Sequence, residues 1–143
     1  MKALVVYDSN FGNTQKIAEV IAKGIDAKAV SIKDIQASEL IDFDLLVVGS
    51  PIIGWKPSPR MINFLSGLTP GQLTGTKVTS FDTRVELFIH GDAASKILKA
   101  LVTVGGEVVL PSTGFHVKGK EGPLFEGEID KAADWAGLIK RGL

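Results

Sequence analysis

The sequence predicts an α/β doubly wound fold, with a five-stranded parallel sheet, in a single domain that spans residues 1–143. Apolar runs typical of strands alternate along the chain with segments whose apolar residues recur at helical spacing, which is the order of elements in βαβ units. The run Leu45–Val48 is apolar without interruption, as in parallel strands that are covered on both faces. With 45% hydrophobic residues, the chain can bury a proper core without disulfides.

Each element is predicted from its apolar spacing and from the residues that bound it. In the first part of the chain, we expect a strand over 3–7, a helix from about 14 to 25, a short edge strand over 27–32 and a one-turn helix or loop around 38–41. There follow a strand over 43–50 that stops at Pro51, a helix around 61–65, a strand over 75–81 and a helix over 93–104. A fifth strand over 108–110 is bent by Pro111 and resumes over 114–117, and a last helix begins at Glu128. Such alternation implies parallel strands with right-handed crossovers.

The turn Asp8–Thr14 between the first strand and the first helix is polar and contains a glycine. Gly12 permits backbone conformations that are closed to other residues. Asn13 or Thr14 suits the N-cap, and the unpaired amides of the first helical turn lie at the positive end of the helix dipole. The hydroxyls of Ser9 and Thr14 can add donors, so the turn is typical of a phosphate-binding site.

The composition excludes several classes of protein. The chain has no cysteine, which excludes thiolate metal sites and cysteine nucleophiles, so any redox chemistry requires a cofactor. The 16 basic and 16 acidic residues are interspersed, which argues against nucleic acid as a partner. No apolar run approaches membrane-spanning length, and the N-terminus leads directly into a strand. We therefore expect a soluble cytoplasmic protein that needs no membrane.

Motifs for other chemistries are incomplete. Gly114–Lys120 resembles the start of a Walker A motif, but Glu121 stands where a serine or threonine must hold magnesium. The chain has no Gly-x-Ser-x-Gly motif, and two distant histidines without cysteine make a poor zinc site. His90 precedes an expected helix, where a histidine is usually solvated or capping. Ser50-Pro51 ends the third strand where a phospho-receiver domain needs a carboxylate, which excludes that class.

The turn after the first strand resembles the FMN-phosphate loop of the flavodoxins, although Phe11 stands where that family often has a third hydroxyl. The resemblance implies that Ser9, Asn10, Phe11, Gly12, Asn13 and Thr14 bind FMN through its phosphate. It also implies the flavodoxin-like strand order 2-1-3-4-5, in which ligands bind beyond the carboxyl ends of strands one and three. Those ends are Asp8–Thr14 and Ser50–Pro59.

The loop Ser50–Pro59 is stiffened by three prolines. It resembles the second flavin loop of the flavodoxins, which opens Gly-Thr/Ser-Pro and often offers a tryptophan. The resemblance implies that Ser50, Pro51, Ile52, Ile53, Gly54 and Trp55 line the flavin ring, with the Trp55 indole stacked on it. The alternative is that Trp55 is a half-buried packing residue.

The third flavin loop follows the fourth strand, and it departs from the family pattern because it has no tyrosine. The resemblance implies only that Asp82, Thr83 and Arg84 contact the pyrimidine edge of the flavin. Phe88 is a candidate to stack on the ring in place of the tyrosine, although such a residue is more often part of a core.

Taken together, the resemblance implies an electron carrier that binds FMN, has no catalytic side chain or metal site, and exchanges electrons with a redox partner protein. Two alternatives remain: a small FMN-dependent reductase of NAD(P)H or a quinone, and a binding module that has lost its cofactor. The oligomeric state is left open. Flavodoxins are typically acidic, whereas Lys56, Arg60 and Arg84 flank the expected site here, so we expect a less negative potential for the second one-electron reduction.

Overall fold

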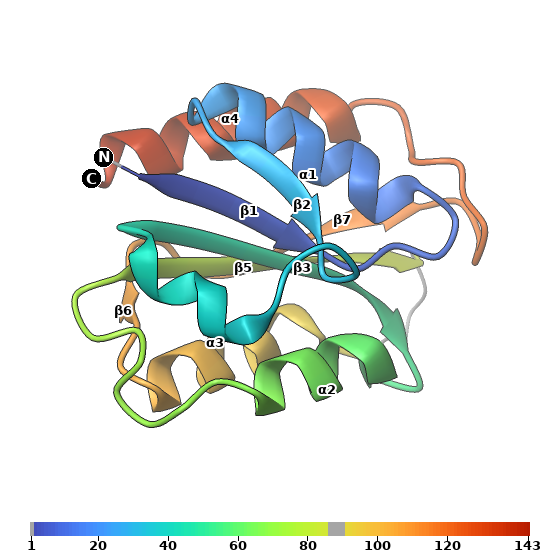
Figure 1. Cartoon of the computed structure of the whole chain (residues 1–143). Helices are drawn as coiled ribbons and strands as arrows, with labels where there is room; N and C mark the ends of the chain where they lie inside the picture. Colours follow the sequence, from blue (N-terminus) through green and yellow to red (C-terminus); the bar gives the residue numbers. More distant parts are fainter. Residues whose placement is uncertain (1, 86–90) are drawn as a thin grey trace.

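The computed structural model of the chain describes residues 2–85 and 91–143, which form a twisted sheet between two layers of helices (Figure 1). The strands are β1 (Ala3–Tyr7), β2 (Lys28–Ser31), β3 (Leu45–Ile53), β4 (Lys56–Pro57), β5 (Lys77–Val85), β6 (Glu107–Val108) and β7 (Thr113–Val117). The helices are α1 (Asn13–Gly24), α2 (Pro59–Ser66), α3 (Ala94–Thr103) and α4 (Glu128–Arg141), and a 3-10 helix, η1, spans Ala37–Asp42. The α/β doubly wound prediction is confirmed.

The sheet has the order β2-β1-β3-β5-β6, and these neighbours pair in parallel, as predicted. The expected fifth strand is in two pieces that share one partner: β6 pairs with residues 77–78 of β5, and β7 pairs with residues 81–85. Pro111 lies between the pieces, where it has no amide to donate to the ladder. The Thr79 hydroxyl bridges the gap by donating to the carbonyl of Leu110 at 2.7 Å.

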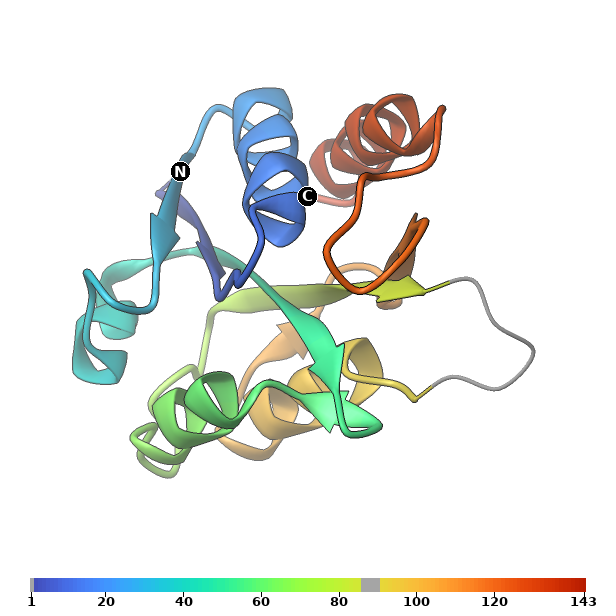
Figure 2. The ribbon, with the colours of Figure 1, turned by 90° about the vertical axis from the view of Figure 1, so that its right-hand side faces the viewer.

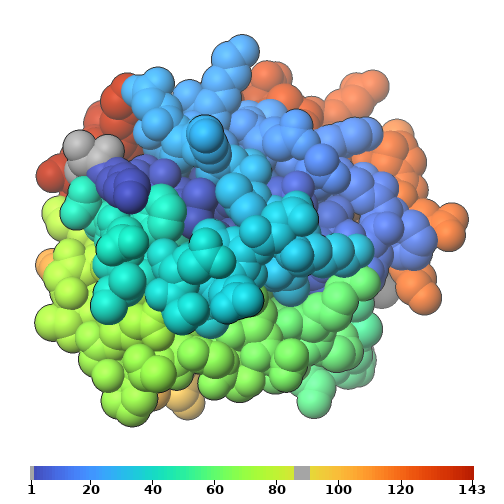
Figure 3. Space-filling view, in the orientation of Figure 1, coloured from blue at the N-terminus to red at the C-terminus, as the bar shows by residue number. Residues whose placement is uncertain are grey.

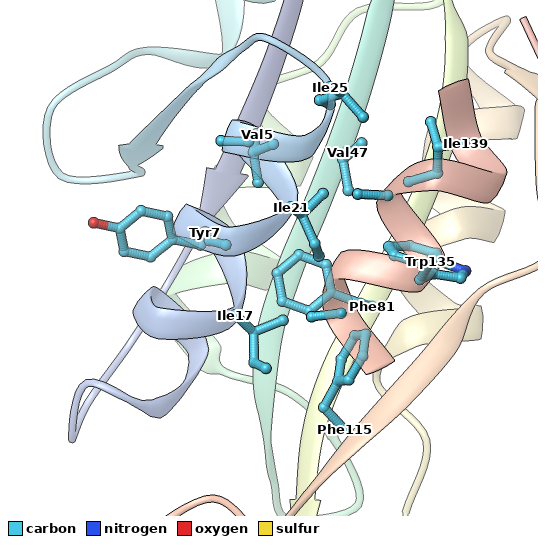
Figure 4. Close-up of a cluster of buried hydrophobic side chains, with 14 of the residues drawn as sticks. Val5, Tyr7, Ile17, Ile21, Ile25, Val47, Phe81, Phe115, Trp135 and Ile139 are labelled. Atoms are coloured by element: carbon cyan, nitrogen blue, oxygen red, sulfur yellow. The ribbon is translucent and has the colours of Figure 1, made fainter. Parts of the chain in front are cut away.

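A separate core covers each face of the sheet. Under α1 and α4, the rings of Phe81, Phe115 and Trp135 meet edge to face with centroids 5.9 to 6.3 Å apart (Figure 4). Under η1, α2 and α3, the core is mainly aliphatic. Leu45 and Val47 belong to the first core, whereas the alternate residues 46 and 48 belong to the second, so β3 is covered on both faces as predicted.

The prediction that the third strand stops at Pro51 is wrong. Pro51 still lies opposite Thr83 of β5, and β3 continues to Ile53 before a two-residue turn leads into β4. Gly54 and Trp55 form this turn with φ values of 59° and 72°. A tight hairpin of this kind requires positive φ at both positions. Because Trp55 has a Cβ, the conformation costs about 1–2 kcal/mol.

The carboxyl ends of β1, β3, β5 and β7 meet at one end of the sheet, on the right in Figure 1, while the C-terminus lies at the other end. The segments that leave these strands therefore lie close together although they are far apart in sequence. Within residues 2–85 and 91–143, no helix combines the length and the apolar character needed to cross a membrane.

Gly24 and Gly137 provide a matched test of how closely α1 packs on α4. A methyl group at Gly24 would lie 2.6 Å from the Cβ of Ala136, whereas one at Gly137 would meet nothing within 4 Å. We expect Gly24→Ala to lower the free energy of unfolding by about 1–3 kcal/mol, because overpacking forces the helices apart. Gly137→Ala should raise it by roughly 0.5–1 kcal/mol through helix propensity. Urea unfolding measures both, and effects of the same sign would contradict the close packing.

Candidate functional site

A cavity of about 440 Å³ opens at the carboxyl end of the sheet. Figure 2 looks onto this end, where the β1–α1 turn, the β3–β4 hairpin and the segment 118–127 surround it. Its lining residues are Ser9, Asn10, Phe11, Asn13, Thr14, Pro51, Ile52, Ile53, Gly54, Thr83, Val85, Val117 and Lys120. The volume and the mixture of apolar walls with a few polar groups are typical of a small-molecule site.

The hydroxyls of Ser9 and Thr14 in the β1–α1 turn make hydrogen bonds within the protein. Gly12, with φ of 89°, is the N-cap of α1, so the prediction of Asn13 or Thr14 as N-cap is wrong by one or two residues. The Ser9 hydroxyl oxygen accepts hydrogen bonds from the amides of Gly12 at 3.1 Å and Gln15 at 3.4 Å, and thereby holds the turn in shape. The amides of Asn13 and Thr14 belong to the first helical turn, whose N–H groups have no partner within the helix.

Two further contacts fix this turn against neighbouring segments. The hydroxyls of Thr14 and Thr83 lie 2.9 Å apart in a buried pair, which joins α1 to the end of β5. The side-chain amide of Asn13 donates to the carbonyl of Glu121 at 3.1 Å, which holds the segment 118–122 over the start of α1.

A fully buried carboxylate, Asp8, joins the first turn to the second loop. Its oxygens accept from the Ser58 hydroxyl at 2.5 Å and from Nε of Arg60 at 3.1 Å. Arg60 extends the link, because its Nη2 also donates to the side-chain oxygen of Asn10. The Ser58 amide donates to Ser50 Oγ at 3.0 Å. The two loops that the strand order places side by side are therefore tied together by one hydrogen-bond network.

The β3–β4 hairpin contributes an apolar wall to the cavity. Pro51, Ile52, Ile53 and Gly54, which the resemblance places beside the flavin ring, line this cavity. Ser50 is fully buried and uses its hydroxyl within the loop, so it does not line the cavity. Trp55 is 57% exposed at the turn of the hairpin and lies outside the lining. Its stacking on a flavin stays a prediction, as does the cofactor-binding role of every other predicted residue.

Of the three residues predicted after strand four, only Thr83 lines the cavity. Asp82 is fully buried, and its carboxylate accepts from Nε and Nη2 of Arg84, both at 2.7 Å, and from the amides of Ala93 and Ala94. Asp82 thus caps α3 and compensates the charge of Arg84. Phe88 and His90 lie outside the residues that the structure describes.

The charges around Arg84 follow from this arrangement. The hydrogen bonds to Asp82 raise the pKa of Arg84, although burial acts in the opposite sense. Burial also tends to raise the pKa of Asp92, but the hydrogen bonds from Ser95 and the nearby cations Arg84 and Lys96 outweigh it, so the pKa of Asp92 lies below its ordinary value. Both ions therefore stay charged around neutrality.

The sequence analysis missed three lining residues: Val85, Val117 and Lys120. The parallel topology could have indicated Val85 and Val117, because they end β5 and β7 at the same end of the sheet. Lys120 comes from the incomplete Walker A motif. The segment 117–124 brings it back over the sheet as a narrow hairpin, closed by the Lys118 amide donating to the Pro123 carbonyl at 2.8 Å.

Among the described residues, Lys120 is the one charged side chain in the lining. Arg60 and Arg84, which were expected to flank the site, are each paired with a buried carboxylate. Their fields at the cavity are partly cancelled, so the expectation of a less negative second potential loses support from two of its three residues.

We expect Asp8→Asn to loosen the connection between the two loops. The substitution removes the charge that holds Ser58 and Arg60, and should lower the free energy of unfolding by roughly 1–3 kcal/mol. Asp26→Asn is the matched control, because Asp26 is 82% exposed and its ion pair with Lys140, at 3.2 Å, is a surface contact of little energetic value. Denaturant unfolding compares the two variants, and an equal loss would contradict the special role of Asp8.

Comparisons with known proteins agree with this architecture. A family described as "Flavodoxin domain" matches residues 4–85, which is more than half of the chain. The flavodoxin of Clostridium beijerinckii is 40% identical over 55 residues, 35% of this chain and 40% of that protein. The flavodoxin of Aquifex aeolicus is 32% identical over 92 residues, 57% of this chain and 49% of that protein. The matched region thus spans about half or less of these two relatives.

Solved structures resemble the whole chain. Oxidised flavodoxin 2 from Bacillus cereus superposes with a TM-score of 0.86 at 25% identity, and covers 100% of both chains. Oxidised flavodoxin 1 from the same organism gives the same TM-score at 20% identity. The family match includes β1, the turn after it, β3, the β3–β4 hairpin and β5, which together supply most of the cavity. On these grounds, the chain belongs to the flavodoxin family.

Proposed function

We propose that the chain binds FMN non-covalently in this cavity and carries electrons between redox partner proteins. The observation that supports this most is the position of the cavity, which has the unpaired amides of α1 at one side and an apolar hairpin at the other. Phosphate and a conjugated ring are the two ends of FMN, and each end has a chemically suitable wall.

The phosphate would lie against the first turn of α1. The amides of Asn13 and Thr14 and the positive end of the helix dipole favour an anion there. Lys120 adds a cation to the same cavity, and the Asn13 contact to Glu121 holds its segment over this turn. The lining has no aspartate or glutamate among the described residues, so an anion meets no like charge within the cavity walls.

The ring would lie between apolar side chains. Ile52 and Ile53 form one wall, and Val85 and Val117 lie at the ends of β5 and β7. Phe11, which is 49% exposed, lies in the β1–α1 turn and adds an apolar surface on the phosphate side of the cavity. These walls bind, orient and shield the ring from water.

FMN supplies the redox chemistry when it is bound, since it accepts and donates electrons singly or in pairs. The chain's part in this proposal is to hold the ring at the surface, close to a partner. The polar lining groups, Ser9, Asn10, Asn13, Thr14, Thr83 and Lys120, suit binding, which favours a carrier over an enzyme that transfers protons to a substrate.

The first experiment is an FMN titration of purified full-length chain from which any flavin has been removed. We expect saturable binding that quenches flavin fluorescence and yields a yellow protein with one FMN per chain. Absence of binding at high FMN concentration would overturn the proposal and favour a binding module without cofactor. NAD(P)H oxidation tests the reductase alternative: the carrier should turn over only when a separate reductase is added, whereas steady oxidation by the purified protein alone would contradict it.

If Lys120 contacts the phosphate of FMN, its removal should weaken the binding of FMN but not of riboflavin. We expect Lys120→Gln to weaken FMN binding about tenfold, because a charge-assisted hydrogen bond of roughly 1.5 kcal/mol is lost. Binding of riboflavin, which has no phosphate, should not change. Lys118→Gln is the control, since Lys118 lies over the ring of Phe125 and does not line the cavity. Equal weakening of FMN and riboflavin would show that Lys120 acts on the ring or on folding.

A further inference from the structure

The net charge of the chain is zero. Within the layer of η1, α2 and α3, the acidic residues Glu39 and Asp42 lie on η1, whereas α2 and α3 carry only positive charge. The elements β4, α2 and α3 contain Lys56, Arg60, Lys96 and Lys99 but no aspartate or glutamate. Each of α1 and α4, on the other side of the sheet, carries charges of both signs. Because Arg60 is compensated by Asp8, the net positive charge of the first group comes from its three lysines, of which Lys96 also has Asp92 nearby.

An apolar groove runs between these same elements. Its two parts have volumes of about 300 and 350 Å³, and both are lined by Lys56, Pro57, Ile62 and Ser66. Leu65, Ala100 and Lys96 complete the part next to α3. Ile62 is 42% exposed on the outer surface of α2, so an apolar side chain is flanked by two lysines. We refer to this groove with its lysines as the basic groove.

The basic groove borders on the cavity proposed for FMN. Ile53 lines both, because it is the last residue of β3 before the hairpin turns. Figure 2 shows the hairpin beside α2 and α3, and the space-filling view shows α2 at the surface next to it (Figure 3). Lys96 reaches across to the hairpin, where its ammonium donates to the Trp55 carbonyl at 3.2 Å. This contact places a cation and a 57% exposed tryptophan at one edge of the groove.

We propose that the basic groove is the docking surface for an acidic redox protein that exchanges electrons with this chain, an inference that rests on the proposed function. A protein interface usually has an apolar centre and a polar rim. The exposed Trp55 favours a protein partner, and the positive charges of Lys56 and Lys96 favour an acidic one. A partner seated here would cover Ile53, and would thus lie beside the cavity, where electron transfer requires it.

A second copy of the chain suits the groove less well. A two-fold dimer through this surface would bring Lys56 and Lys96 of one protomer against the same lysines of the other, because such an interface is self-complementary. Like charges at an interface are costly, whereas an acidic partner gains attraction and faster association at the same positions.

The test uses two redox proteins of opposite charge. The FMN-loaded full chain, labelled with ¹⁵N, is titrated with an acidic [2Fe–2S] ferredoxin and, separately, with basic cytochrome c. At low ionic strength we expect saturable shift changes from ferredoxin that cluster on β4, α2, α3 and the hairpin, and much weaker changes from cytochrome c. Added salt of about 0.15 M should weaken the binding, because exposed charges are then screened beyond about 8 Å.

Charge reversal identifies the surface. We expect Lys56→Glu with Lys96→Glu to weaken ferredoxin binding about tenfold or more. Lys23→Glu with Lys28→Glu makes the same change in net charge on α1 and β2, and should alter binding by less than about twofold. Both pairs are exposed, and circular dichroism checks that each variant is folded.

Three results would overturn the proposal: no binding of ferredoxin, equal weakening by both pairs of substitutions, or shift changes on the α1 and α4 layer. Self-association that is abolished by Lys56→Glu with Lys96→Glu would assign the groove to a second copy. Binding to phosphatidylglycerol vesicles in place of ferredoxin would assign it to a membrane surface.

The same titration without FMN separates the docking proposal from the proposed function. Ferredoxin binding to a chain that fails to bind FMN would leave the docking surface standing and overturn only the proposed function.

Discussion

The parallel alignment of β1, β3 and β5 is the constraint on which the site depends. Parallel strands end on the same side, so the carboxyl ends of β1, β3 and β5 lie at one edge of the sheet although they are distant in sequence. Strands covered on both faces are largely apolar, as β1 and the first half of β3 are here. The cavity at the ends of the strands combines polar groups, such as Thr14 and Thr83, with the apolar wall of the β3–β4 hairpin.

At this end of the sheet, two buried carboxylates do similar structural work. Asp8 follows β1 and holds Ser58 and Arg60, while Asp82 lies in β5 and holds Arg84 and the start of α3. A buried charge is tolerated only when it is paired and hydrogen-bonded, and both aspartates are. Each one also pairs with an arginine and partly cancels the field of that arginine at the cavity. Among the described lining residues, Lys120 is then the one charged side chain.

The elements of the fold could be predicted because their signals are local. The uninterrupted run Leu45–Val48 and the helical spacing of the apolar residues in α1 and α4 do not depend on distant contacts. The strand order came from a resemblance, and the positions of Ile52, Ile53 and Thr83 at the cavity followed from that order.

Side-chain directions could not be predicted in the same way. Asp82 and Arg84 flank the lining residue Thr83 in sequence, but they bond to each other. Asp82 also accepts from the amides of Ala93 and Ala94 at the start of the next helix. The direction of Trp55 depends on a tight turn in which Gly54 and Trp55 have positive φ. This hairpin could not be predicted, because Pro51 normally indicates the end of a strand. Lys120 reaches the cavity only because of contacts that its segment makes with Asn13 and Pro123.

The hydroxyl pair of Thr14 and Thr83 has a consequence for how the cavity responds to charge. Two hydroxyls carry two hydrogens, and the bond between them, 2.9 Å long, uses one. The second hydrogen is always left over, and either residue can hold it, since the two directions of the bond are equivalent in heavy-atom geometry. Rotation of two O–H groups therefore suffices to turn a donor toward an anion or toward a carbonyl. The polarity of this wall can adapt to what is bound while every heavy atom stays in place.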